Sequence, residues 1–137
     1  MAYPHHPSAG TGIGLRQPHV ENFMLGTPTI DWLEVHSENY LQENSKRRHQ
    51  LRHIRNNYAV SCHGIGLSLG SSDPLNLDPL NLDPLNLDHL KSLRTLFDEI
   101  EPSLISEHLS WSSLNGRFYN DLRPLSCTNE ALQHMIN

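Results

Sequence analysis

Residues 30–36 read Ile-Asp-Trp-Leu-Glu-Val-His, and this stretch, IDWLEVH, decides the fold class. It is a short run with apolar residues in most positions, which makes it a strong candidate for a β-strand. A helix-like segment follows it at 44–58, and a second apolar run, AVSCH, follows at 59–63. A strand, a helix and another strand in this order predict a parallel sheet with helices packed on it.

The same unit recurs along the whole chain. We predict strands at 12–15, 30–36, 59–63 and 103–109, and helices at 19–25, 44–58, 87–100 and 128–137. Gly26 and Pro28 are expected to end the first helix, Pro102 the third, and Thr128 is expected to cap the fourth. Four βα units make half of an eightfold barrel, with open edges and an uncovered apolar interior. We therefore expect an α/β fold in one domain, 1–137, that is a truncated half barrel.

Two predicted helices have distinct faces. In the helix at 44–58, Leu51, Ile54 and Tyr58 form an apolar face. A second face carries Arg48, Arg52 and Arg55, and we expect it to be solvated, with a nucleic-acid patch as the alternative. In the helix at 87–100 the apolar face repeats every 3.6 residues, through Leu90, Leu93, Leu96, Phe97 and Ile100.

A five-residue repeat, DPLNL, occurs three times in residues 73–87. Each copy carries a helix-start signal, because Asp is a good N-cap and Pro suits the first helical position. A period of five is too short for a solenoid, whose repeats have about 20–50 residues. We predict that 73–88 is a surface loop expanded by repetition, with a binding role as the alternative.

The composition excludes several classes of protein. The net charge is −5, which argues against a nucleic-acid partner, and no apolar run approaches the ~18–20 residues of a membrane span. The N-terminal residues lack the pattern of a signal peptide, and two cysteines make no disulfide framework. We therefore expect a cytoplasmic protein. Cys62 is expected to be a buried filler and not a nucleophile.

Polar residues close or follow each predicted strand at its carboxyl end, where parallel sheets collect their functional groups. They are Arg16, His19, His36, Glu38, Asn39, His63, Glu107 and His108. Glu34, His36 and Glu38 occupy alternate positions, and three ionisable groups on one strand face are costly unless they are paired or bound to metal. Each residue alone also fits a structural role. Their convergence indicates a metal site, and imidazole with carboxylate suits iron or manganese, and zinc less distinctively.

Six segments, in order, resemble a known family. They are GIGLR (12–16), WLEVHSENY (32–40), CHGIGLSLGS (62–71), DPLNLDHL (83–90), LISEHLSWSS (104–113) and FYNDLRPL (118–125). This set resembles the DUF692 family, the multinuclear non-haem iron-dependent oxidases. The resemblance implies a TIM-type (β/α)8 barrel with two or three iron ions, which uses O2 to modify cysteines of ribosomally made peptides. It also implies two partners, the precursor peptide and a small protein that recruits it.

By this resemblance, the best candidates for metal ligands are His63 and Glu107, with Glu38 and His108 as further ligands or as groups that orient them. Arg16, His19, His36 and Asn39 are expected to face substrate or to support the ligands. The chain matches only the first half of the family barrel, so we expect little activity from it alone. Two alternatives stay open: an inactive remnant of such a barrel, or a divalent-metal barrel of the isomerase or endonuclease kind.

Overall fold

The computed structural model describes residues 10–71, 85–115 and 117–136. Within the predicted repeat loop, residues 73–84 lie outside the described residues, and 85–88 belong to a helix. The chain divides into two compact units, Met1–Gly64 with Ser92–Ser106, and Ile65–Lys91 with Glu107–Asn137. Within the described residues, no helix is long and apolar enough to cross a membrane.

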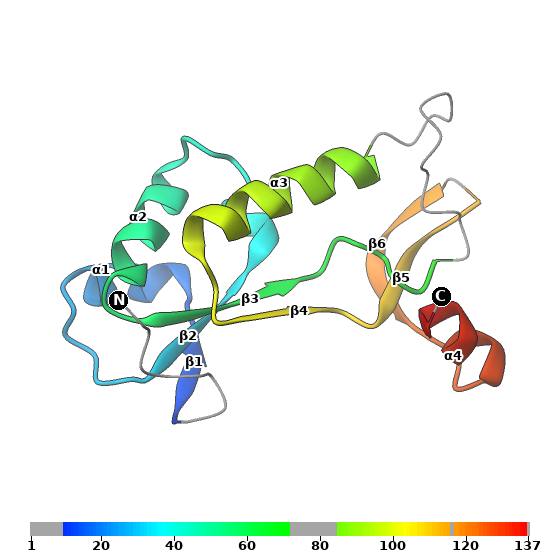
Figure 1. The fold of residues 1–137 in the computed structure, drawn as a ribbon, viewed down its shortest axis with the longest axis horizontal. Helices are drawn as coiled ribbons and strands as arrows, with labels where there is room; N and C mark the ends of the chain where they lie inside the picture. The colour runs from blue at the N-terminus through cyan, green and yellow to red at the C-terminus, as the bar shows by residue number, and fades with distance from the viewer. Residues whose placement is uncertain (1–9, 72–84, 116, 137) are drawn as a thin grey trace. The chain divides into compact units, whose positions relative to one another are not determined.

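Four short strands form one open sheet (Figure 1). They are β1 (Gly12–Gly14), β2 (Trp32–His36), β3 (Ala59–Gly64) and β4 (Leu104–Glu107), in the order β1-β2-β3-β4. β1 pairs with β2 and β2 with β3 in parallel, so the predicted parallel sheet is confirmed. The described residues form no closed barrel, and the architecture is compatible with part of one.

Helical segments connect the strands. They are η1 (Gln17–His19), α1 (Val20–Met24), η2 (Ser37–Tyr40), α2 (Lys46–Arg55) and α3 (Leu85–Ile100). Ser45 caps α2, because its Oγ accepts a hydrogen bond from the Arg48 amide. Gly26 follows α1 with a φ of +68°, a conformation that suits glycine at a helix end, as predicted.

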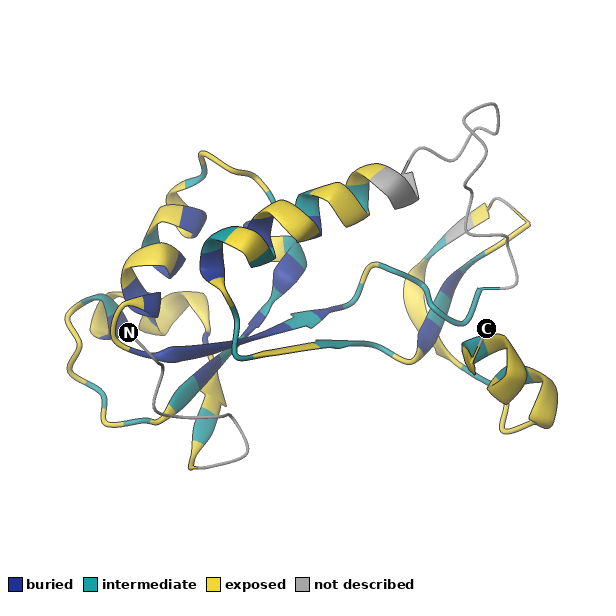
Figure 2. Ribbon diagram, viewed as in Figure 1, coloured by how far each residue is buried: buried dark blue, intermediate teal, exposed yellow. Residues whose placement is uncertain are grey.

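The core lies on one face of the sheet. Burial alternates along β2, where Leu33 and Val35 are buried while Trp32, Glu34 and His36 are half-buried. The core joins strand residues Leu33, Val35, Val60 and Cys62 to helix residues Phe23, Leu51, Ile54, Leu96 and Ile100. Figure 2 shows these buried positions gathered where the helices meet β2 and β3. The predicted apolar faces are confirmed for Leu51, Ile54 and Tyr58, and for Leu93, Leu96 and Ile100, whereas Leu90 is exposed.

The prediction of a solvated arginine face on α2 is wrong for two of its three members. Arg48 is fully buried, and its Nε donates a 2.8 Å hydrogen bond to Oε2 of Glu99 on α3. Arg55 is buried as well, and its Nε donates to the Ile100 carbonyl at 2.5 Å. Both partners are more than forty residues away along the chain, so the local pattern around α2 carried no sign of them.

Gly12 is required by a close approach between β1 and β2. It is the register partner of Trp32, and a Cβ at Gly12 would lie 2.0 Å from the indole ring. Real Cβ atoms do not come so near another side chain, so only glycine lets the ring cover this strand. The first residue of β1 must therefore be glycine, because a larger residue would clash with the Trp32 ring.

The second unit contains a hairpin that the sequence analysis missed. β5 (Ser110–Leu114) and β6 (Arg117–Pro124) pair antiparallel in a stretch for which we predicted neither a strand nor a helix. Asn115 begins the turn with a φ of 53°, and Asn-Gly is a strong hairpin signal that should have been recognised. The final helix, α4 (Asn129–Ile136), follows, and Thr128 caps it as predicted by accepting from the Ala131 amide.

Candidate functional site

Two imidazoles meet at the carboxyl ends of neighbouring strands. His36 ends β2, His63 lies near the end of β3, and the two are register partners. Their ring centroids are 6.0 Å apart, with 59° between the ring planes. Both belong to the sheet face opposite the core, because their strand neighbours Val35 and Cys62 point into the core. The parallel pairing of β2 with β3 therefore brings together two histidines that are far apart in the sequence.

His63 has a partner on the third strand. Its Nδ1 and Oγ of Ser106 on β4 share a hydrogen bond 2.8 Å long. A partner at one ring nitrogen fixes the orientation of an imidazole, and metal-binding histidines usually have such a partner. The sequence analysis named the residue that follows Ser106 and missed Ser106 itself, because its role depends on the strand order.

The same sheet face carries two more polar residues nearer the amino ends of β2 and β3. Glu34 on β2 and Ser61 on β3 are register partners, two residues before His36 and His63. Ser61 is fully buried, and its Oγ has no hydrogen-bond partner among the described residues. A buried hydroxyl without a protein partner is costly, so Ser61 adds a buried polar group to the sheet face that carries Glu34 and the two histidines.

The prediction that Glu34, His36 and Glu38 share one strand face is correct only for the first two. The strand ends at His36, and Glu38 belongs to the 3-10 helix η2 that follows. The helical turn buries Ser37 and Tyr40 and leaves Asn39 exposed. Glu38 therefore lies near the strand end but does not continue its alternation.

A cavity of about 200 Å³ opens beside His36, at the carboxyl ends of β1 and β2. Three residues predicted for the site line it: Arg16, His36 and Asn39. Two further residues line it: Glu34, which the sequence analysis named only for sharing the strand face of His36, and Arg47, which was not among the predicted site residues. His19 is exposed at the end of η1 and is not part of this lining.

Tyr40 forms the buried wall of the cavity. Burial raises the pKa of its phenol, and the nearby Arg47 guanidinium works in the opposite direction. Burial disfavours the charged form of any acid, whereas a neighbouring positive charge favours it. The phenol therefore stays protonated, and the charged groups of the cavity are Arg16, Arg47 and Glu34.

Glu107 and His108 are neighbours in the chain, and both belong to the other unit. Oε1 of Glu107 accepts a 3.1 Å hydrogen bond from the His108 amide. Among the residues that the structure describes, no group of three or more His, Cys, Asp or Glu side chains is arranged to hold a metal. Of the predicted site residues within the described part of the chain, His36 and His63 are thus the two that the fold brings together from separate strands.

Cys62 has the role predicted for it. It is fully buried in the core, and burial raises the pKa of its thiol to about 12. A thiol with such a pKa is almost entirely protonated near neutral pH, and the thiolate is the reactive form. Cys62 therefore acts as an apolar filler, while Cys127 is exposed.

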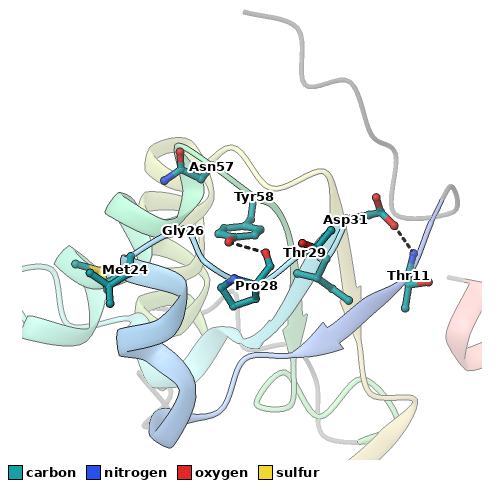
Figure 3. Close-up of a pocket in the computed structure, with 10 residues that line it drawn as sticks. Thr11, Met24, Gly26, Pro28, Thr29, Asp31, Asn57 and Tyr58 are labelled. Carbon is teal, nitrogen blue, oxygen red and sulfur yellow. Dashed lines mark hydrogen bonds between the residues drawn. The ribbon is translucent and has the colours of Figure 1, made fainter.

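A larger cavity, of about 820 Å³, lies at the amino ends of the strands, opposite the ends that carry the histidine pair (Figure 3). It is bordered by the loop before β2, where the Tyr58 hydroxyl donates to the Pro28 carbonyl and the Thr11 amide donates to Asp31. These residues precede the strands. In parallel barrels, the face at the amino ends of the strands contributes to stability more than to catalysis. Neither imidazole of the histidine pair lines this cavity, so size alone does not identify the site.

The first unit thus has helices on one sheet face and imidazoles and charged groups at the carboxyl ends of adjacent strands. These features define an α/β protein assembled from βα units, with its candidate site where such proteins place theirs.

Comparison with known proteins identifies the family. Residues 10–137 match the family described as "RiPP precursor modification enzyme MbnB/TglH/ChrH", whose substrates are precursors of ribosomally made, modified peptides, and the chain belongs to this family. A UPF0276 protein of Vibrio vulnificus is 47% identical over 128 residues, which are 93% of this chain and 40% of the relative. UPF0276 proteins of Vibrio parahaemolyticus and Psychromonas ingrahamii are 45% and 44% identical, over 95% and 94% of this chain and 41% and 42% of the relatives. The chain spans about 40% of the length of these curated relatives.

Proposed function

We propose that this chain forms the first part of an iron-dependent oxidase that modifies cysteine residues of ribosomally made precursor peptides with O2. Family membership supports the class of substrate. The single structural observation that supports metal chemistry is the histidine pair, with His63 oriented by Ser106. Enzymes of this family are metal-dependent.

The donor set of the chain suits iron. Imidazole and carboxylate are ligands of non-haem iron, and the buried thiol of Cys62 does not compete for the metal. We propose that His63 and Glu107 bind metal, and that Glu38 and His108 bind it or orient those ligands. The whole enzyme would hold two or three iron ions, and the iron supplies the redox chemistry with O2.

The remaining residues of the site have supporting roles in this proposal. Ser106 holds the His63 ring in one orientation, and β2 and β3 fix the spacing of His36 and His63. Arg16, His19, His36 and Asn39 contact substrate or support the ligands, and three of these line the cavity beside the pair. A precursor peptide and a small recruiting protein are the proposed partners.

The chain's length gives a second candidate. Because it spans about 40% of its curated relatives, the isolated chain could carry too few ligands to hold iron, as an inactive remnant would. Half a ligand set in an open site binds metal weakly. The two candidates differ in whether the purified chain retains iron.

Iron content decides between them. The chain is purified anaerobically after Fe(II) loading, and bound iron is measured by mass spectrometry beside His63→Gln and Glu107→Gln variants. His53→Gln is the matched control, because His53 is exposed on α2. We expect iron in the original chain and the control, and much less bound iron in both variants, because loss of a ligand weakens metal binding. Equal iron in all four proteins contradicts the ligand assignment, and no iron in any of them supports the remnant.

A further inference from the structure

The cavity beside His36 holds two arginines that the sequence analysis did not connect. Arg16 follows β1, Arg47 lies in the first turn of α2, and both line the same space of about 200 Å³. Thirty-one positions separate them in the sequence, so only the parallel pairing of β1 with β2 and the return of α2 bring them together. Two guanidinium groups at one small cavity make a local positive region on a chain whose net charge is −5.

Neither guanidinium is neutralised within the described residues. Arg16 and Arg47 make no ion pair within 4.0 Å and no side-chain hydrogen bond there, although Glu34 lines the same cavity. Other arginines of this unit are paired: Arg48 and Arg52 with Glu99, and Arg94 with Asp98. The contrast sets the two cavity arginines apart from the structural ones.

The position of Arg47 strengthens the case for an anion. The first turn of α2 contains no acidic residue and begins with Lys46 and Arg47. A helix N-terminus carries partial positive charge, so cations there are unfavourable and anions are favourable. The one buried cation of that turn, Arg48, is compensated by Glu99, whereas nothing described compensates Arg47. An anion in the cavity would relieve this conflict.

We propose that Arg16 and Arg47 form a subsite for a carboxylate of the bound peptide, either its C-terminus or an acidic side chain. Guanidinium groups bind carboxylates through paired, charge-assisted hydrogen bonds. The side-chain amide of Asn39 adds a donor at the same wall. The cavity is smaller than the roughly 300–1,000 Å³ of drug-sized ligand sites, so it has room for one such group.

The subsite deepens the proposed function, and only the peptide nature of its ligand rests on that function. Its location is consistent with the role, because the cavity shares His36 with the histidine pair. A carboxylate held there would fix one end of a peptide close to the proposed metal ligands of the first unit. The binding itself needs no metal and can be measured on the metal-free chain.

The test uses three short N-acetylated peptides and inorganic phosphate. One peptide has a free C-terminal carboxylate, the second has the same sequence with a C-terminal amide, and the third is amidated and contains one glutamate. Binding to the metal-free chain is followed through the amide NMR signals of Gly14, Gln17 and Asn39. Arg16→Gln and Arg47→Gln are compared with Arg94→Gln, which removes the same charge from an exposed pair on α3.

We expect a carboxylate peptide to bind the original chain and Arg94→Gln, and to bind each cavity variant about tenfold more weakly. The peptide that binds identifies the source of the carboxylate, and both binding alike still supports the subsite. Equal binding of the fully amidated peptide overturns the subsite, as does equal affinity in all three variants. Binding of phosphate without either carboxylate peptide overturns the peptide assignment. Peptide binding is measured on the metal-free chain, so it does not depend on whether the chain holds iron. The carboxylate subsite and the metal-ligand assignment can therefore be refuted independently.

Discussion

Nε of Arg48 on α2 donates a 2.8 Å hydrogen bond to Oε2 of Glu99 on α3, fifty-one residues further along the chain. Arg48 is fully buried and Glu99 is 27% exposed, so the pair lies between a surface ion pair and a buried one. Arg52 binds the other carboxylate oxygen. This carboxylate therefore ties two turns of α2 to α3.

Replacement of this carboxylate should destabilise the fold. In Glu99→Gln, the Arg48 guanidinium stays buried without its counter-charge, and we expect a loss of about 2 kcal/mol in the free energy of unfolding. Urea denaturation followed by circular dichroism measures it. Asp98→Asn, which breaks the exposed pair with Arg94, is the control and should cost well under 1 kcal/mol. Equal losses in the two variants would show that the buried pair has no special weight.

The same carboxylate should make stability depend on acid. Burial alone would raise the pKa of Glu99, but the hydrogen bonds from Arg48 and Arg52 outweigh it and lower the pKa. A group with a lowered pKa in the folded state stabilises fully above its unfolded pKa of about 4.3, and the stabilisation is lost as the pH falls through the lowered value. Urea midpoints between pH 7 and pH 3 should fall more steeply for the original chain than for Glu99→Gln. Parallel curves would refute this.

Only one cysteine should react in the native state. Burial raises the pKa of Cys62 to about 12, while Cys127 is exposed. A thiol reagent at pH 8 should therefore modify one cysteine per chain before denaturation and two after it. The Cys127→Ser variant should show none in the native state. Rapid native modification of that variant would mean that Cys62 is accessible.

The contact between Gly12 and Trp32 should be intolerant of any side chain. In Gly12→Ala the new Cβ meets the indole ring, and we expect a loss of about 1–3 kcal/mol together with a shift in tryptophan fluorescence. Gly14→Ala is a matched control on the same strand, because the nearest side-chain atom, Nε of Arg16, is 3.7 Å from its Cβ position. Thermal unfolding compares the two. Similar melting temperatures would contradict the packing argument.

Ser106 should influence metal binding through His63. Ser106→Ala removes the partner of Nδ1, and we expect about a tenfold loss in iron affinity with little change in stability. Ser103→Ala, three residues earlier, is the control. Iron titration of the metal-free chain is the measurement. An unchanged affinity in Ser106→Ala would mean that His63 does not depend on this hydrogen bond.

The sequence predicted the parallel sheet well, because its strands and helices carry local signals. The runs ending at His36 and His63, the cap at Thr128 and the glycine at Gly26 all act within a few residues. Arg48 and Arg55 were misplaced on solvent because their partners lie in α3. Charged side chains beside the apolar face of a helix are usually exposed to solvent, and only a tertiary partner makes their burial favourable.

The candidate site shows the same limit. Strand ends could be read from the sequence, so Arg16, His36, Asn39 and His63 were named in advance. Ser106 and Arg47 were not, because their roles come from strand order and from the return of α2 across β2. The β5–β6 hairpin was missed for a different reason, since its Asn-Gly signal is local and was available.

Along β2 and β3, alternate residues face opposite sides of the sheet and have different roles. Leu33, Val35, Val60 and Cys62 serve cohesion, while Glu34, His36, Ser61 and His63 interleave with them on the opposite face. Substitution on one face therefore need not perturb the other. Evolution can therefore change the polar residues of these two strands while it keeps the core residues that alternate with them.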